Sequence, residues 1–176
     1  MIPLKVVNRQ TVFQSEKVQI DRETIELPDG TTAKWDLMVY PNFYLAVTVK
    51  DNMVLLTKEW RQGPRDYLTQ FTKARAPHIT EEENLHELAR ELSEELGVIG
   101  GNYKKLVRYA HGERLSGFCT AYLVTNFTLG LTNRDELEFQ DVLELPIKGL
   151  YQELVDHHIV MSETLLVAKL LEEQFA

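Results

Sequence analysis

The sequence predicts a mixed α/β (α+β) fold in which helices cover a mixed sheet, with an antiparallel β extension at the N terminus. Three patterns predict it. Residues 11–39 show strand-like alternation around a turn, residues 43–58 form a second hairpin pattern, and residues 80–98 have the spacing of one helix. No repeat or linker interrupts the chain. We therefore expect an extension over residues 1–40 and a main domain over residues 41–176.

The extension is predicted to be a hairpin. Residues 11–27 and 31–39 are its arms, because polar and apolar residues alternate along much of the first arm. The tripeptide Pro28-Asp29-Gly30 between them has the composition of a turn.

The second hairpin joins residues 43–50 to residues 53–58 through Asp51-Asn52. Its first arm is apolar almost throughout between Tyr44 and Val49, which predicts burial on both faces. Residues 63–79, with a glycine and two prolines, are expected to be irregular.

The rest of the chain is predicted to alternate between strands and helices. The expected strands are residues 103–109, 117–126 and 137–145, with a loop over residues 130–135. Two helices close the chain, one over residues 147–157 and one that follows Ser162 as its cap and runs to Glu173.

The helix over residues 80–98 has marked ends. Thr80 and Glu83 form a capping box, and Gly97 suits a left-handed exit. The apolar residues recur every three or four positions and form a stripe that can pack on a core: Leu85, Leu88, Ala89, Leu92 and Leu96.

Acidic residues lie beside that stripe, namely Glu87, Glu91, Glu94 and Glu95, with Arg90 as the cation among them. Like charges four residues apart destabilise a helix, so something else is expected to compensate them. Mg²⁺ fits, because it prefers oxygen ligands and is usually held by a few carboxylates together with substrate phosphates. The alternative is an acidic helix face that is simply solvated.

Composition limits the possible partners and compartments. The chain has 176 residues, 44% hydrophobic and 26% charged, with a net charge of −8. That charge argues against nucleic acid or an anionic membrane as the main partner, since both attract basic patches. The single cysteine, Cys119, excludes an internal disulfide framework and is expected in a buried strand. Neither a signal peptide nor a membrane span is predicted, so a cytoplasmic location is expected.

The order of residues in the acidic helix resembles a known motif. Arg90-Glu91-Leu92-Ser93-Glu94-Glu95-Leu96-Gly97-Val98 matches the second half of the Nudix box, R-E-U-x-E-E-x-G-U with U aliphatic, and Glu82 occupies the earlier glutamate of that box. The glycine expected six residues before Glu82 is Ala76 here. The resemblance to the Nudix hydrolase family implies an α/β/α sandwich that hydrolyses a diphosphate bridge.

The wider pattern is similar to the branch of ADP-ribose and nucleoside-diphosphate-sugar pyrophosphatases. Glu59-Trp60-Arg61, after an aliphatic strand, resembles its Gln-Tyr-Arg signature, and Pro28-Asp29-Gly30 resembles its dimerising N-terminal region. The tail from Glu144 through Thr164 resembles its closing helices. This resemblance implies a homodimer and a small-molecule nucleoside diphosphate derivative as substrate, with ADP-ribose or a sugar nucleotide favoured.

The resemblance also implies roles for particular residues. Glu91 and Glu95 would be the principal ligands of Mg²⁺, with Mn²⁺ as an alternative, and Glu94 would be a third ligand or a water-mediated contact. Arg90 would hold these carboxylates, and a main-chain carbonyl near Ala76 would join the metal shell. Glu82 would orient Arg90 or the start of the helix.

A general base is expected from the acidic loop that follows the main helix in the sequence. The loop Arg134-Asp135-Glu136-Leu137-Glu138 resembles the acidic loop of the branch, and of its two candidates Glu138 is favoured over Glu136. The alternative is a solvated acidic turn.

The predicted substrate contacts are Arg61 with phosphate, Trp60 with a nucleobase, and Arg75. The alternatives are a surface salt bridge for Arg61 and a core position for Trp60. The branch usually has Glu-x-Pro-x-Gly before the helix, where this chain has Thr72-Lys73-Ala74-Arg75-Ala76. If the glycine is needed at positive φ, Ala76 is strained by about 1 kcal/mol or more.

The sequence therefore predicts a Mg²⁺-dependent Nudix pyrophosphatase. Two other classes stay open. One is a Nudix-fold protein that binds a nucleotide with weak catalysis or none, which the altered Thr72–Ala76 segment motivates. The other is a structural dimerisation module whose acidic helix faces solvent.

Overall fold

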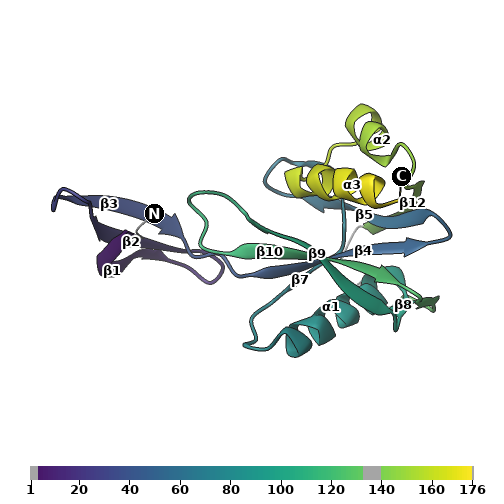
Figure 1. Cartoon of the computed structure of the whole chain (residues 1–176), viewed down its shortest axis with the longest axis horizontal. Coiled ribbons are helices and arrows are strands. Elements are labelled where there is room, and N and C mark those ends of the chain that lie inside the picture. Colours follow the sequence, from purple (N-terminus) through teal and green to yellow (C-terminus); the bar gives the residue numbers. More distant parts are fainter. Residues whose placement is uncertain (1–3, 133–139, 176) are drawn as a thin grey trace. The chain divides into compact units, whose positions relative to one another are not determined.

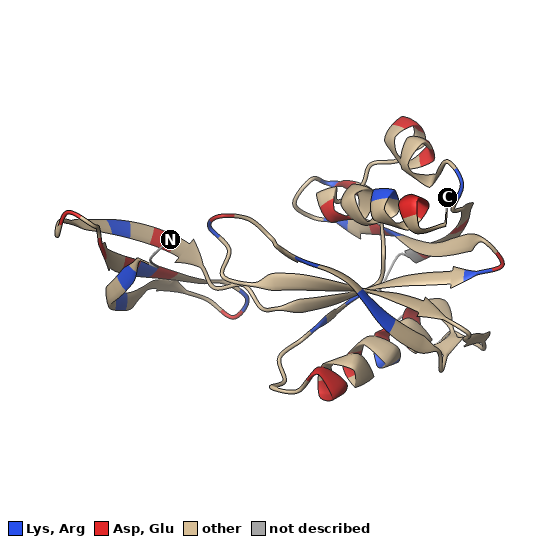
Figure 2. Ribbon diagram, in the orientation of Figure 1, with Lys and Arg blue, Asp and Glu red and all other residues tan. Residues whose placement is uncertain are grey.

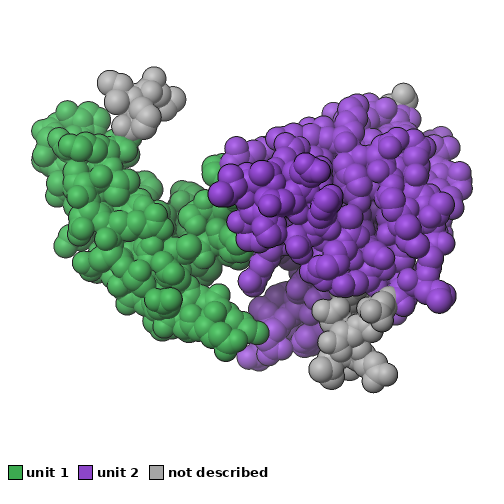
Figure 3. Space-filling view, turned by 90° about the horizontal axis from the view of Figure 1, so that it is seen from below, with its two compact units in different colours: residues 1–42, 109–119 green, residues 43–108, 120–176 purple. Residues whose placement is uncertain are grey.

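The computed structural model describes residues 4–132 and 140–175. They divide into two compact units (Figure 3). The first holds residues 1–42 and 109–119, so it includes a segment that the predicted extension of residues 1–40 did not. The second holds residues 43–108 and 120–176.

The first unit is built on a three-stranded antiparallel sheet of β1 (Lys5–Gln14), β2 (Gln19–Glu26) and β3 (Thr32–Met38). The prediction of one strand over residues 11–27 is wrong. Ser15 starts a turn in which its amide donates to the carbonyl of Val18, and its side chain accepts from the Val18 amide. The predicted turn at Pro28-Asp29-Gly30 is confirmed, since Gly30 has a φ of 81° and donates to the Leu27 carbonyl.

Residues 109–119 join this unit through backbone hydrogen bonds to the end of β3. Met38 donates to the Arg114 carbonyl at 2.9 Å, and Ser116 donates to the Met38 carbonyl at 3.1 Å. The Arg114 guanidinium also lies 4.9 Å from the centre of the Trp35 ring, a cation–π distance. A segment distant in sequence thus completes the unit.

The second unit contains a seven-stranded mixed sheet in the order β12-β5-β4-β10-β9, with β6 paired to β5 and β7 paired to β4. Its strands are β4 (Phe43–Lys50), β5 (Met53–Arg61), β6 (Asp66–Gln70), β7 (Lys73–Arg75), β9 (Asn102–Ala110), β10 (Phe118–Thr125) and β12 (Gln140–Pro146). A short ladder joins β8 (Val98–Ile99) to β11 (Thr128–Leu129).

The hairpin of β4 and β5 is confirmed. Asp51 and Asn52 both have positive φ, as a tight turn of this kind requires, and residues 45–49 are buried. The prediction of an irregular segment over residues 63–79 is wrong in part, because β6 and β7 lie within it. These strands are short, and their pairing with β5 and β4 rather than local periodicity defines them.

Helices cover both faces of this sheet (Figure 1). One face carries α1 (Glu81–Leu96), whose Leu88, Leu92 and Leu96 are buried in a cluster with sheet residues such as Ala74. The opposite face carries α2 (Leu150–His157) and α3 (Ser162–Gln174). The expected mixed α+β fold is confirmed, with helices on either side of the sheet of the second unit.

The predicted ends of α1 are confirmed. Thr80 is the N-cap and accepts from the Glu83 amide, while Gly97 leaves the helix with a φ of 68°. The predicted cap of α3 is wrong by one residue, since Met161 is the N-cap and Ser162 the first helical residue. None of the helices in residues 4–132 and 140–175 is long and apolar enough to cross a membrane.

Candidate functional site

The acidic flank of α1 is organised around Arg90. Its Nη1 donates to Glu94 at 2.7 Å, its Nη2 to Glu91 at 2.5 Å, and its Nε to Glu87 at 3.3 Å. The hydrogen bond to Glu94 and the charge of Glu91 raise the pKa of Arg90. One guanidinium thus offsets the repulsion among three carboxylates, which Figure 2 shows as acidic positions along α1.

Glu95 receives a hydrogen bond from Thr72, which lies between β6 and β7. The hydroxyl of Thr72 donates to Glu95 Oε2 at 2.8 Å, and Thr72 is buried. About 100° of rotation per residue places Glu95 nearer the packed stripe of α1 than Glu91 or Glu94. The acids therefore extend from the sheet surface towards the solvent-exposed back of the helix.

The donor types on this flank suit a hard divalent cation. Glu91, Glu94 and Glu95 offer carboxylate oxygens, which Mg²⁺ prefers, and Mg²⁺ commonly needs only one or two of them besides substrate phosphates and water. Within the described ranges, no group of three or more His, Cys, Asp or Glu side chains is arranged to hold a metal ion. The residues thus fit Mg²⁺ by chemistry, without a preformed three-acid cluster among the described residues.

Ala76 is not strained at the position where the resemblance expected glycine. Positive φ outside glycine occurs, in the described part of the chain, at Asp51, Asn52, Arg65 and Asn126. Ala76 is buried with an ordinary backbone, so the left-handed strain considered from the sequence does not arise.

The face of the sheet that packs against α1 carries a row of polar side chains. Leu55 and Ala74 belong to the α1 cluster, so alternation places Thr57, Glu59 and Arg61 of β5 on that face. Gln70 lies opposite Thr57 in the ladder and two residues before Thr72. Gln70 Nε2 and Arg61 Nη2 both lie 2.9 Å from Glu59 Oε2. Arg61 is therefore on the same face as Glu95, paired with Glu59.

Trp60 and Arg75 belong to the other face. Alternation along β5 turns Trp60 away from Glu59 and Arg61, and its ring packs edge-on against Tyr67 at 5.3 Å. Trp60 is 42% exposed, so it is not the core aromatic of the alternative interpretation. Arg75 shares the face of Lys73, two residues earlier on β7.

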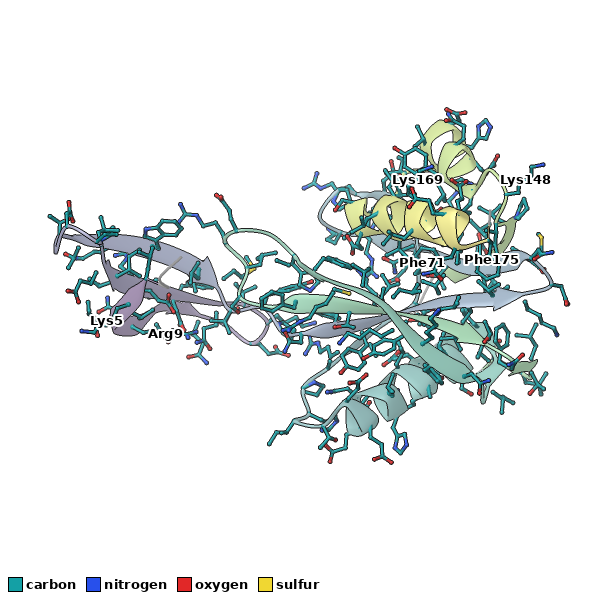
Figure 4. All side chains as sticks on the ribbon, viewed as in Figure 1. Lys5, Arg9, Phe71, Lys148, Lys169 and Phe175 are labelled. Atoms are coloured by element: carbon teal, nitrogen blue, oxygen red, sulfur yellow. The ribbon has the colours of Figure 1, made fainter. Side chains whose placement is uncertain are left out.

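Lys73 is engaged on that second face. Its Nζ lies 2.7 Å from Glu163 of α3, and the two side chains are 15% and 10% exposed. Phe71 is fully buried on the same side (Figure 4). Lys73 therefore pairs on the face of the sheet opposite to the acidic helix.

The loop residues Glu136 and Glu138 lie outside the described residues. They precede β12 in the sequence, and its first residue, Gln140, is opposite Glu59 in the ladder. Their role as general base stays a prediction.

A cavity of about 710 Å³ lies elsewhere in the second unit. Its lining includes Met53, Ile147, Lys148, Glu172 and Phe175, two of which Figure 4 labels. None of the predicted site residues that the structure describes lines this cavity.

Sequence reasoning missed Thr72, Gln70 and Glu59 as a group. Thr72 was noted only because it departs from the Glu-x-Pro-x-Gly segment of the branch, and Glu59 only because it replaces the glutamine of the Gln-Tyr-Arg signature. In a strand, residues two positions apart share a face, so alternation from Gln70 through Thr72 to Ala74 could have placed Gln70 and Thr72 together. The sequence did not predict β6 and β7 as strands, so this alternation could not be applied.

No protein-family model matches the chain. Among curated proteins, it is similar to a methanol dehydrogenase activator of Bacillus methanolicus, with 22% identity over 184 aligned positions that cover 98% of this chain and 94% of that protein. Among solved structures, it resembles the crystal structure of an ADP compounds hydrolase, with a TM-score of 0.85 and 17% identity. That match covers 99% of this chain and 95% of the other, and it establishes the fold.

Proposed function

Because this chain has the fold of the Nudix hydrolases, as its sequence motif implied, we propose that it is a divalent-metal-dependent pyrophosphatase. Its substrate is a nucleoside diphosphate linked to a second moiety, with ADP-ribose or a sugar nucleotide favoured. The observation that carries this proposal is the arrangement of Glu91, Glu94 and Glu95 around Arg90 and Thr72. The hydrolase activity named for the structural neighbour supports it.

The reaction needs the diphosphate charge to be neutralised and a water molecule to be aligned and deprotonated. A bound Mg²⁺ would supply the neutralising charge, held by Glu91, Glu94 and Glu95 with the main-chain carbonyl of Ala76.

The chain's own groups supply the rest. Arg90 fixes the carboxylates of Glu91 and Glu94, and Thr72 fixes that of Glu95. Arg61 has guanidinium N–H groups beyond the one given to Glu59, and these can donate to a phosphate. Glu138, or Glu136 in its place, takes the proton of the attacking water.

The test is hydrolysis of a panel of ADP-ribose, sugar nucleotides and dinucleotides with Mg²⁺ or Mn²⁺. We expect cleavage to two phosphate monoesters that stops when the metal is chelated. Product analysis separates this from phosphatase activity, which would release inorganic phosphate directly. Absence of cleavage across the panel, with a folded protein and either metal, would contradict the proposal.

A second candidate is a Nudix-fold protein that binds a nucleotide and acts without hydrolysis. Two observations favour it: the altered Thr72–Ala76 segment before the helix, and the similarity to a protein named as an activator. Calorimetry with ADP-ribose, alongside the hydrolysis panel, separates the candidates. Binding without metal-stimulated cleavage favours this one.

The proposed homodimer forms through the first unit. β1 is an edge strand with β2 as its neighbour, and all ten of its residues are exposed. Phe13, Ile20 and Met38 lie side by side across the sheet, and Phe13 and Met38 are 51% and 37% exposed. An unpaired edge beside an apolar row favours association.

Sedimentation of the variant Phe13→Lys tests the proposed dimer, with Gln10→Lys on the same strand as the control. We expect Phe13→Lys to be monomeric and Gln10→Lys to remain dimeric.

The proposed location is the cytoplasm. Cys119 is buried and is the single cysteine of the sequence, so no disulfide can form within the chain, which suits a reducing compartment. Fractionation of cells that express the tagged chain tests this.

A further inference from the structure

Glu59 is held by two donors on one oxygen. Gln70 Nε2 and Arg61 Nη2 each lie 2.9 Å from Oε2, and the Glu59 side chain is 20% exposed. The β5 alternation puts this carboxylate on the α1 face of the sheet, the face on which Thr72 holds Glu95. The group is therefore fixed in direction and still reachable from solvent.

The position of Gln70, which donates to Glu59, lowers the stability of the fold. It is 3% exposed, and its Oε1 is buried without a hydrogen-bond partner among the described residues. A buried amide oxygen without a donor destabilises the fold, whereas an apolar side chain of similar length would not. Such groups in native structures call for a functional reason. Here that reason is the amide N–H that fixes the carboxylate.

The chemistry around Glu59 selects its ligand. A further cation is disfavoured because the Arg61 guanidinium already lies at Oε2. A phosphate is repelled by the Glu59 carboxylate, so it would contact the Arg61 N–H groups that do not face Glu59. A hydroxyl fits both neighbours, since it donates to the carboxylate and accepts from the guanidinium. Charge-assisted hydrogen bonds of this kind are the stronger ones.

We propose that Glu59 recognises a sugar hydroxyl of the substrate, and that Gln70 is a positioning residue that fixes Glu59 for this contact. The inference rests on the proposed function and deepens it. It assigns the substrate class as a nucleoside diphosphate with a free ribose or sugar hydroxyl next to the diphosphate. Compounds that lack that hydroxyl are poor ligands.

The experiment compares ADP-ribose with three analogues. One lacks the ribose hydroxyls of the nucleoside, one lacks those of the distal sugar, and one has hypoxanthine in place of adenine and so lacks the base amino group. Each is measured with the wild type, Glu59→Gln and Gln70→Met, and with Glu144→Gln as a control. Glu144 is an exposed acid of β12, on the same face of the sheet and outside the proposed site.

We expect the wild type and the control to prefer ADP-ribose by about ten- to a hundredfold in kcat/KM over one of the two deoxy analogues. Glu59→Gln and Gln70→Met lose that preference. Gln70→Met also keeps or raises the melting temperature, because it removes a buried unsatisfied amide. A merely structural Gln70 would instead lower the melting temperature and leave the preference intact.

Two results overturn the inference. One is an unchanged preference in both variants. The other is that the variants lose only the preference for ADP-ribose over the hypoxanthine analogue, which would show that Glu59 contacts the base and not a sugar hydroxyl. If no compound is cleaved, the proposed function fails. The affinities of ADP-ribose and its analogues, measured by calorimetry for the same variants, then test the hydroxyl contact on their own.

Discussion

Thr72, between β6 and β7, donates a hydrogen bond of 2.8 Å to Glu95 on α1, a residue 23 positions away in the sequence. Thr72 is 1% exposed, so water does not compete freely for its hydroxyl. The bond fixes one carboxylate of the acidic flank relative to the sheet. Gln70, Glu59 and Arg61 form a row of polar side chains on the same face of the sheet.

Thr72→Val should lower activity more than stability. It keeps the shape of Thr72 and removes the hydroxyl, so we expect about 1 kcal/mol of lost stability and a fall in kcat of about tenfold as Glu95 loses its fixed orientation. Thr48→Val is the matched control, because Thr48 is also buried and its hydroxyl bonds to a backbone carbonyl, that of Leu55. Urea unfolding and steady-state kinetics check both. Equal activity in the two variants would contradict a role for the Thr72 bond.

Glu95→Gln should abolish most turnover with little loss of stability. It removes a charged oxygen donor and, at the same time, the repulsion between Glu91 and Glu95, while an amide can still accept from Thr72. We expect kcat to fall by roughly two orders of magnitude or more, with weaker Mg²⁺ binding in calorimetry. Glu173→Gln, an exposed acid of α3, should change neither. Near-wild-type turnover in Glu95→Gln would count against the site.

Gly97→Ala should destabilise the second unit. Gly97 has a φ of 68°, and a Cβ there would lie 2.5 Å from the Gly130 carbonyl oxygen, which is backbone and cannot turn aside. The left-handed strain alone costs about 1 kcal/mol, and the contact adds to it. Gly63→Ala meets no atom within 4 Å and has no positive φ, so its stability should stay within about 0.5 kcal/mol of wild type. Chemical denaturation of both variants checks this.

His158 should make stability depend on pH below neutrality. Burial lowers the pKa of His158, with Lys58 and His157 adding to this and Glu153 opposing it. Because the folded state binds the proton less readily than the unfolded state, the unfolded state takes up more protons as pH falls below about 6.5. The contribution of neutral His158 to stability is therefore fully present above that pH and is lost progressively as the pH falls below it.

The variant His158→Asn isolates the contribution of His158 protonation to stability. Its amide can still reach the Thr69 hydroxyl, which lies 3.0 Å from His158 Nδ1 in the wild type. The difference in melting temperature between wild type and variant should shrink or reverse between pH 7 and pH 5. A constant difference would show that His158 does not titrate in this range.

Local signals predicted the helix α1 and its two ends well. Thr80, Glu83 and Gly97 mark the ends of α1 because capping depends on residues within one turn. The Asp51-Asn52 turn and the buried β4 arm follow from composition in the same way. By contrast, Ser15–Val18 broke an expected strand with no glycine or proline to signal the turn.

The sequence by itself determined that this chain has an acidic amphipathic helix with Arg90 among its glutamates, because helical periodicity and capping are set by neighbours three or four residues apart. Tertiary structure alone decided which side chains meet those acids. The pairing of β6 with β5 and of β7 with β4 turns Thr72, Gln70, Glu59 and Arg61 towards α1, and turns Trp60 and Lys73 away. Strand register fixes the face of every residue, and register depends on partners that are distant in sequence.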